Sequence, residues 1–267
     1  MFFDGKSVRE EILADLAKKV SKMKRRPTIA VFLIGNDPVS AKYSEIKQKI
    51  ANKIGIDFCL YKFEDDDTQI DAIKCIEYLN NDPETDGIMI QIPVPDKFDR
   101  DALIGKISAE KDVDGLRYCA ELESNFRPPV VLSILEAIKR SGTEINNKTK
   151  IALIGCGFLV GAPLLRSLKE DYKDSDLIVA CGRGADVENM TKDADIVISA
   201  TGSPNIIKPE MIKDDAILID AGTAEENGEL VGDIDTKSYE KASYYTPVPG
   251  GIGPVTVAML FRNLVSK

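Results

Sequence analysis

The stretch that most constrains this fold runs from Ile151 to Pro163 and reads IALIGCGFLVGAP. Its apolar start predicts a buried strand, its glycines predict a tight turn, and the LLRSLKE that follows has helical spacing. Gly155 permits the turn, Gly157 lets a pyrophosphate approach the backbone, and Gly161 lets helix and strand pack closely. The spacing GxGxxxG is one residue longer than the usual dinucleotide fingerprint. Because glycine turns also end strands that bind nothing, the stretch alone leaves its ligand open.

Strands and helices alternate along the rest of the chain. Apolar runs predict strands at residues 28–34, 56–62, 87–95, 177–181, 194–202 and 216–222. Helical patterns separate these runs, so the sheets should be largely parallel. The expected fold class is α/β, with an N-terminal α/β domain over residues 1–128 and a Rossmann-like dinucleotide-binding domain over residues 129–252.

Composition narrows the classes of function. The 267 residues carry a net charge of −9, which argues against nucleic acid or an anionic membrane as the main partner. Histidine is absent, so any general base must be Lys, Asp, Glu, Tyr or Cys. The five cysteines have no CxxC spacing, which predicts reduced thiols and no metal site. The N-terminus has no signal-peptide pattern, and no apolar run is long enough to span a membrane, so a cytoplasmic protein is expected.

The first candidate for chemistry is the segment SAKYSEIKQK, which contains Tyr43 and Lys47. On a helix these two side chains stand four residues apart on one face. A lysine desolvated beside an aromatic ring has a lowered pKa and can serve as a base. The alternative is a solvated basic helix face, which is common.

Three further groups interrupt the apolar pattern. Gln91 ends the apolar run IMIQIPVP, where it can contact a ligand at a strand end or simply hold the proline loop. Asp112 and Asp114, in KDVDG, can do chemistry or cap a turn. Gly250 and Gly251, in PVPGGIGP, leave a bare backbone just before a helix, which suits close contact with a cofactor ring or phosphate.

Together these motifs resemble one family over nearly the whole chain. The motifs YSEIKQK, IQIPVP, EKDVDG, GxGxxVGxP and TPVPGGIGPVTVAML occur in the order found in FolD proteins, the bifunctional methylenetetrahydrofolate dehydrogenase/cyclohydrolases. The resemblance implies that 5,10-methylene-tetrahydrofolate is oxidised to 5,10-methenyl-tetrahydrofolate and then hydrolysed to 10-formyl-tetrahydrofolate. It also implies a homodimer, an active-site cleft between the two domains, and a last helix, residues 253–267, that packs back onto the N-terminal domain.

The resemblance assigns a role to each matching residue. The implied catalytic residues are Lys47, Gln91, Tyr43 and Asp114. Tyr43 and Asp114 would also bind folate, together with Pro249, Gly250 and Gly251. The cofactor-binding residues are Gly155, Gly157, Phe158, Leu159, Val160, Arg183, Thr201, Gly202 and Thr256.

Two departures from the family pattern bear on the cofactor. The family's PCTPxG is replaced by PPVVLS, so Val130 stands where a threonine hydroxyl would lie near the nicotinamide. The Arg-Ser pair of the glycine turn is replaced by Cys156 and Gly157. Arg183 follows the second Rossmann strand, where NAD enzymes usually carry an acid, so a cation there favours NADP over NAD.

Two other functions fit parts of the pattern. A dehydrogenase without hydrolase activity would have no need of Lys47. A catalytically dead nucleotide-binding regulatory protein would be consistent with the lost PCTPxG, but it would not need Tyr43, Gln91 or Asp114.

Overall fold

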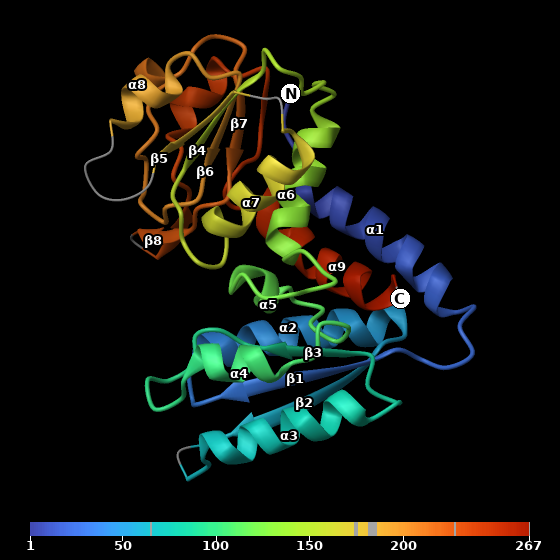
Figure 1. Ribbon diagram of the computed structural model, residues 1–267. Helices are drawn as coiled ribbons and strands as arrows, with labels where there is room; N and C mark the ends of the chain where they lie inside the picture. Colours follow the sequence, from blue (N-terminus) through green and yellow to red (C-terminus); the bar gives the residue numbers. More distant parts are fainter. Residues whose placement is uncertain (65, 174–175, 181–185, 227, 267) are drawn as a thin grey trace. The chain divides into compact units, whose positions relative to one another are not determined.

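The computed structural model describes residues 1–64, 66–173, 176–180, 186–226 and 228–266 (Figure 1). It forms two compact units, each with its own parallel sheet. The three-stranded unit consists of Glu10–Pro129 and Val257–Lys267, and the five-stranded unit of Met1–Arg9 and Val130–Thr256. The α/β fold class is confirmed.

The three-stranded unit has the strand order β2-β1-β3, with every pairing parallel. Its elements are β1 (Thr28–Ile34), α2 (Pro38–Ile54), β2 (Asp57–Phe63), α3 (Gln69–Asn81), β3 (Gly87–Ile90), α4 (Arg100–Lys106) and α5 (Leu116–Cys119). The local sequence fixes where α2 begins and ends. Asp37 caps its start by accepting from the Ser40 N–H, and Gly55 ends it in the left-handed conformation, at φ 84°. These stops place α2 directly between β1 and β2.

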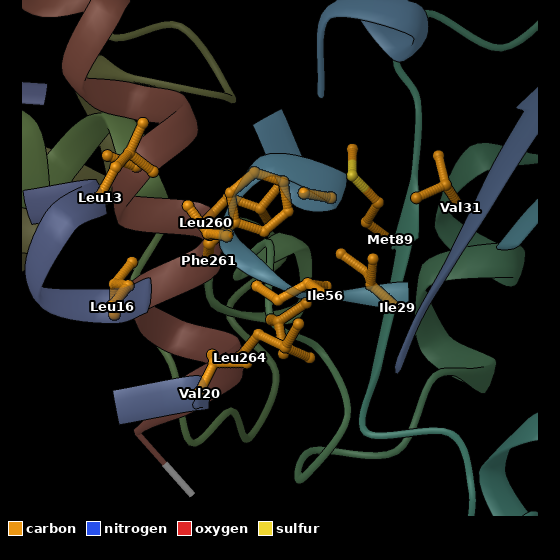
Figure 2. Packing of buried hydrophobic residues seen from close by; sticks show 14 residues of the cluster. Leu13, Leu16, Val20, Ile29, Val31, Ile56, Met89, Leu260, Phe261 and Leu264 are labelled. Atoms are coloured by element: carbon orange, nitrogen blue, oxygen red, sulfur yellow. The ribbon is translucent and has the colours of Figure 1, made fainter. Parts of the chain in front are cut away.

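The core of the three-stranded unit joins the central strand to both ends of the chain (Figure 2). Ile29 and Val31 of β1 belong to the same buried cluster as Leu13 and Leu16 of α1 (Gly5–Val20) and Phe261 of α9 (Ile252–Val265). Burying one such side chain stabilises a fold by about 1.5–3 kcal/mol. The part of α9 from residue 257 onward therefore belongs to this unit.

The five-stranded unit has the order β10-β7-β6-β4-β5, again all parallel. Its elements are α6 (Pro129–Arg140), β4 (Lys150–Ile154), α7 (Gly161–Asp171), β5 (Asp176–Ala180), α8 (Val187–Thr191), β6 (Ile196–Ser199), η1 (Pro209–Met211), β7 (Ile217–Asp220), the hairpin β8 (Ala224–Glu226) and β9 (Glu229–Val231), η2 (Thr236–Glu240) and β10 (Tyr244–Tyr245). The chain leaves β4 for β5 on one side and later returns to β6 on the other. In open α/β sheets, ligands bind at the carboxyl ends of the strands beside such a reversal.

The compact units differ from the expected division at the N-terminus. Residues 1–9 belong to the five-stranded unit, although the sequence division at residue 128 placed them in the first domain. The Phe3 N–H donates to the Tyr245 carbonyl at 2.8 Å, and Phe2 lies with its ring 6.2 Å from that of Tyr245. Backbone pairing with β10 thus decides where this segment belongs, and a helical pattern beginning near Val8 could not reveal it.

Candidate functional site

Lys47 and Gln91 meet at the carboxyl end of the three-stranded sheet. Gln91 follows β3 directly and extends the ladder, since its N–H donates to the Phe32 carbonyl at 2.8 Å. Lys47 lies in the middle of α2, and its Nζ donates to Gln91 Oε1 at 2.8 Å. The Gln91 Nε2 donates to the Ile92 carbonyl at 3.1 Å, which fixes which amide atom faces the lysine. The bond to Ile92 agrees with the support of the proline loop, and contact of Gln91 with a ligand stays a prediction.

The surroundings of Lys47 favour its neutral amine. Burial lowers the pKa of Lys47, and the charge of Asp114 opposes that effect. Burial raises the pKa of Asp114, and Lys47 opposes it in turn. Gln91 is a neutral acceptor, so it holds the amine in place without adding a negative charge that would keep the lysine protonated. An oriented amine with a lowered pKa can accept a proton from water.

The two acids of the KDVDG turn have separate tasks. Asp112 is fully buried and accepts from the Leu116 and Arg117 N–H groups at 3.0 and 2.8 Å, so it caps the short helix α5. Burial, with a smaller contribution from the charge of Asp114, raises the pKa of Asp112 to about 7. Asp114 acts electrostatically on Lys47. The capping alternative is therefore correct for Asp112, and Asp114 is the acid associated with the lysine.

The last helix holds this turn in place. Asn263 of α9 is buried, and its Nδ2 donates to the carbonyls of Val113 and Arg127 at 2.9 and 3.0 Å. Val113 stands between the two acids, so their position depends on a residue 150 positions away in the chain. Sequence reasoning missed Asn263, although an amide within the apolar stretch VAMLFRNLV was a visible signal.

Tyr43 lies one helical turn before Lys47 on α2, and half of its surface is exposed. Val39 and Ile46 on the same helix are also exposed, at 58% and 40%. A row of exposed apolar surface beside a buried amine suits a flat ligand. The predicted stacking role of Tyr43 is compatible with this exposure and stays a prediction.

The glycine turn after β4 has the geometry that a phosphate needs. Gly155 has φ 99°, and a Cβ there would lie 2.5 Å from the Ala200 carbonyl oxygen, so only glycine fits. A Cβ on Gly161 would collide with the Gly155 carbonyl, whereas one on Gly157 would meet nothing within 4 Å. Val160, the residue at the N-cap of α7, makes no side-chain capping hydrogen bond. An open glycine before an uncapped helix start fits a pyrophosphate group.

The other predicted cofactor residues in the described part of the chain lie in the glycine turn, in α9 and after β6. Phe158 and Leu159 lie in the same turn, and Leu159 is 40% exposed. The Thr256 hydroxyl donates to the Ile252 carbonyl within α9 at 3.2 Å. Gly202 has φ 66°. Arg183, on which the preference for NADP over NAD rests, lies outside the described residues.

Thr201 and Cys156 are used in ways that the sequence did not predict. The N–H and hydroxyl of Thr201 both donate to Asp233, at 2.6 and 2.9 Å, so these groups point into the unit. Cys156 is disulfide-bonded, whereas Cys59, Cys75 and Cys119 are free thiols. The expectation of reduced thiols is thus wrong for Cys156, because a disulfide depends on tertiary proximity and not on the spacing of cysteines in the sequence.

The PVPGG segment is tightly packed around one open glycine. The Gly251 N–H donates to the Pro247 carbonyl at 2.7 Å, and a Cβ on Gly251 would lie 2.6 Å from that oxygen. Gly250 has φ 110°, and a Cβ there would meet nothing within 4 Å. The predicted contact of Pro249 and Gly250 with a ligand therefore has the bare backbone that it requires. Val130, the departure from PCTPxG, lies in the first turn of α6.

Comparisons with known proteins cover both units. Residues 3–114 match the tetrahydrofolate dehydrogenase/cyclohydrolase catalytic domain, and residues 128–267 match the NAD(P)-binding domain of the same family. The chain is 40% identical over 278 aligned residues to the "Bifunctional protein FolD" of Aquifex aeolicus, covering 100% of this chain and 94% of that relative. None of the described helices is both long enough and apolar enough to cross a membrane.

Solved structures agree with these matches. The bifunctional enzyme FolD from Campylobacter jejuni superposes with a TM-score of 0.92 at 32% identity and covers 100% of this chain and 97% of its own. The Trypanosoma brucei methylenetetrahydrofolate dehydrogenase-cyclohydrolase, complexed with NADP cofactor and inhibitor, superposes with a TM-score of 0.90 at 30% identity, covering 100% and 96%.

Proposed function

Since the chain belongs to the tetrahydrofolate dehydrogenase/cyclohydrolase family, we propose that it carries out both reactions of that family. The protein oxidises 5,10-methylene-tetrahydrofolate to 5,10-methenyl-tetrahydrofolate with NADP and hydrolyses the product to 10-formyl-tetrahydrofolate. The hydrogen bond between Lys47 Nζ and Gln91 Oε1 at 2.8 Å carries this proposal, because a neutral, oriented amine is what the hydrolysis needs.

Lys47 acts as the base in the hydrolysis. The 5,10-methenyl group is a cation, so a neutral amine beside it avoids the repulsion that an ammonium group would create. Lys47 Nζ takes a proton from water as the water oxygen bonds to the methenyl carbon. The bond from that carbon to N5 then breaks as the new hydroxyl group loses its proton and the carbon–oxygen double bond forms. N5 takes one proton and the other passes to solvent, which leaves the formyl group on N10. Gln91 keeps the amine lone pair directed at the water by accepting one of its hydrogens.

Asp114 and Tyr43 hold the folate in this proposal. Asp114 hydrogen-bonds the pterin ring, and its charge tunes Lys47. Tyr43 stacks on the aromatic part of the substrate with its exposed ring face. The dehydrogenase step needs orientation more than acid–base help, because bringing reactants into line removes much of the barrier.

The glycine turn holds the cofactor. Gly157 and the uncapped start of α7 receive the pyrophosphate of NADP, which when bound supplies the acceptor for the hydride. Gly250 and Thr256 line the nicotinamide side. Choice of NADP over NAD is assigned to Arg183, and Arg183→Ala should weaken NADP while sparing NAD. A homodimer in the cytoplasm completes the proposal.

The experiment separates both reactions in one purified protein. Wild-type protein with 5,10-methylene-tetrahydrofolate and NADP should produce NADPH, and methenyl-tetrahydrofolate supplied directly should lose its absorbance without cofactor. Lys47→Met should slow this hydrolysis by about 10²–10⁴-fold, the usual contribution of a general base. Lys49→Met, on the exposed side of the same helix, should hydrolyse normally. Normal hydrolysis by Lys47→Met would refute the assignment. The absence of any reduced cofactor, NADPH from NADP or NADH from NAD, would favour the dead regulatory protein.

A further inference from the structure

Two buried acids in the five-stranded unit are not used by the proposed reaction. Asp220 is the last residue of β7, and Asp233 follows the β8–β9 hairpin. Both are fully buried, with 0% exposure. A buried acid is costly unless it is paired or fully hydrogen-bonded, so these two call for an explanation.

Asp220 is surrounded by backbone donors. Its Oδ1 accepts from the Gly222 and Asp233 N–H groups at 3.0 and 3.2 Å, and its Oδ2 accepts from the Ile234 N–H at 2.9 Å. Its own N–H donates to the Thr246 hydroxyl at 2.7 Å. One side chain thereby ties the loop after β7 to the segment that contains Asp233, while its backbone ties β7 to the start of the PVPGG segment.

Asp233 ties the loop after β6 to the same point. Its Oδ2 accepts from the Ser199 hydroxyl at 2.7 Å and from the N–H and hydroxyl of Thr201 at 2.6 and 2.9 Å. Its other oxygen, Oδ1, is buried and has no hydrogen-bond partner among the described residues. A buried oxygen without a hydrogen-bond partner carries a free-energy cost.

Two glycines allow the acids to lie together. A side chain at Gly222 would collide with the carboxyl group of Asp233, and one at Gly232 would collide with that of Asp220. Each acid is therefore packed against the backbone that leads to or from the other. A Cβ added at Gly232 would also lie 3.0 Å from the Val248 Cβ, so the PVPGG segment packs against this glycine too. The two acids are the point at which four segments at the carboxyl edge of this sheet are joined.

Electrostatics distinguish Asp220 within the pair. Burial, helped by the charge of Asp233, raises the pKa of Asp220 to about 7 against the effect of its backbone donors. Among the described residues, Tyr239 of η2 is affected by the charge of Asp220, and Asp235 and Tyr245 in turn act on Tyr239. Burial and Asp220 raise the pKa of Tyr239 well above its ordinary value, so Tyr239 stays neutral and adds no charge near pH 7.

We propose that Asp220 and Asp233 are positioning residues for the nicotinamide nucleotide: the hydrogen bonds that their carboxyl groups accept keep the loops after β6 and β7 in the form that receives the cofactor. This rests on the proposed function, since it takes cofactor binding at this edge of the sheet as given. When pH rises through about 7, Asp220 loses its proton, its new charge repels that of Asp233, and the hold on the loop containing Thr201 and Gly202 weakens.

Calorimetric titration with NADP tests this across pH. In wild type, the Kd should rise by about 10-fold between about pH 6 and pH 8.5, the factor that corresponds to one unit of pKa. Asp233→Asn keeps an oxygen for Ser199 and Thr201 and removes the charge that acts on Asp220. Its Kd should match wild type at pH 6 and show less of this rise. Asp233→Ala should weaken NADP by about 10-fold or more at every pH. Asp214→Asn, an exposed acid just before β7, should behave as wild type.

Hydrolysis of methenyl-tetrahydrofolate, measured on the same samples without cofactor, reports on Lys47 and on folding. If wild type fails to hydrolyse and fails to bind NADP, the proposed function is wrong. If wild type does both and Asp233→Ala still binds NADP normally, the positioning role is wrong. Equal pH dependence in wild type and Asp233→Asn would refute the effect of Asp220 ionisation, because the ionisation of NADP itself is common to both titrations.

Discussion

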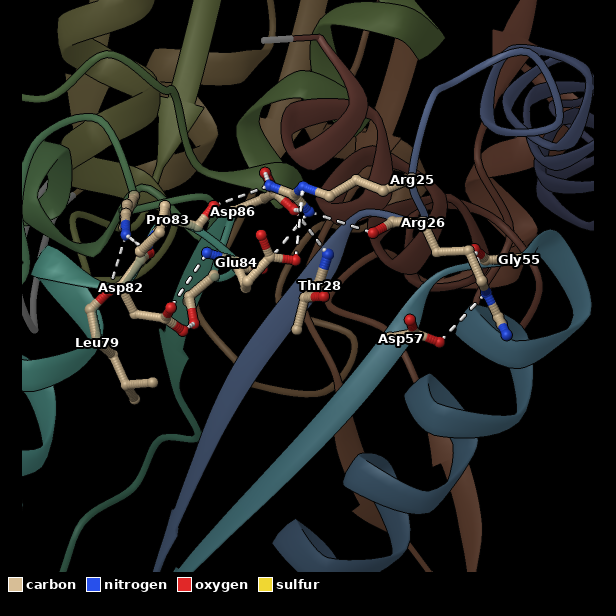
Figure 3. Close-up of polar contacts among 12 residues, drawn as sticks. Arg25, Arg26, Thr28, Gly55, Asp57, Leu79, Asp82, Pro83, Glu84 and Asp86 are labelled. Atoms are coloured by element: carbon tan, nitrogen blue, oxygen red, sulfur yellow. Dashed lines mark hydrogen bonds and ion pairs between the residues drawn. The ribbon is translucent and has the colours of Figure 1, made fainter.

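The cations at the two edges of the three-stranded sheet have different hydrogen-bond partners. At the amino edge, Arg25 donates to both oxygens of Asp86 at 2.6 and 2.7 Å and to the Pro83 carbonyl at 3.0 Å (Figure 3). Asp86 also accepts from the Thr28 N–H at 2.8 Å. At the carboxyl edge, Lys47 donates to the neutral amide of Gln91. Asp114 affects Lys47 through its charge, with no hydrogen bond between the two among the described contacts.

The difference separates stabilisation from reactivity. The paired acid at the amino edge raises the pKa of Arg25, so the guanidinium remains charged and fixes the starts of β1 and β3. At the carboxyl edge burial dominates and lowers the pKa of Lys47, as the proposed base requires. The exposed Arg25 beside a carboxylate keeps its charge, whereas Lys47, held by a neutral amide, has a lowered pKa.

The largest effect should come from making the carboxyl edge resemble the amino edge. Gln91→Glu places a carboxylate against Lys47, which raises its pKa because the charged form gains a partner. Hydrolysis of methenyl-tetrahydrofolate near pH 7 should fall by about 10- to 1,000-fold, for a shift of one to three pKa units, and recover as pH rises. Gln91→Met should lower activity without moving the pH profile. An unshifted profile in Gln91→Glu would show that Lys47 is not the base.

The second prediction concerns a buried acid that has no cation, in contrast to Asp86. The pKa of Asp112 is raised to about 7 by burial, so the folded protein holds a proton that the unfolded chain releases near pH 4. Its contribution to stability is therefore lost as pH rises from about 4 to 7. Relative to Asp112→Asn, wild type should lose up to about 4 kcal/mol over this window, measured by urea unfolding at several pH values. A constant difference between the two proteins would contradict the raised pKa.

Breaking the amino-edge pair should cost stability and spare chemistry. Asp86→Asn keeps an acceptor for the Thr28 N–H and loses the charge that binds Arg25. The free energy of unfolding should fall by about 2 kcal/mol, the usual size of a hydrogen bond to a charged group. Circular dichroism during urea unfolding measures this, and the hydrolysis rate per folded molecule should stay the same. A large loss of rate would mean that the two edges are coupled.

The smallest effect is expected for an exposed ion pair. Lys53 lies 3.0 Å from Glu10, but their side chains are 67% and 48% exposed. Solvent screens such pairs, so Lys53→Ala should change the free energy of unfolding by less than about 0.5 kcal/mol. A larger loss would mean that partners outside this pair depend on Lys53.

Local patterns were enough to predict much of this protein. The apolar run followed by Gly155 and Gly161 predicted a strand, a turn and a helix, and these occur as β4 and α7. The reason is that strands, tight turns and helices follow from periodicity and from backbone conformations that only glycine adopts. The same is true of Asp37 and Gly55, which begin and end α2.

Contacts between side chains that are far apart in the chain could not be predicted from the sequence. Lys47 and Gln91 were each singled out, but their contact joins residues 44 positions apart, and only the packing of α2 against the strand end makes it. The different roles of Asp112 and Asp114 depend on which of them accepts hydrogen bonds from the α5 backbone.

By itself, then, the sequence determined the alternation of strands and helices, the glycine turn after β4, and the residues able to act as a base in a chain without histidine. Tertiary structure alone decided that Lys47 has a neutral partner, that Asn263 holds the KDVDG turn, and that Asp220 and Asp233 are buried together. The physical reason is that pKa values and hydrogen-bond partners depend on burial and on distances between atoms far apart in the chain, which residue spacing does not encode.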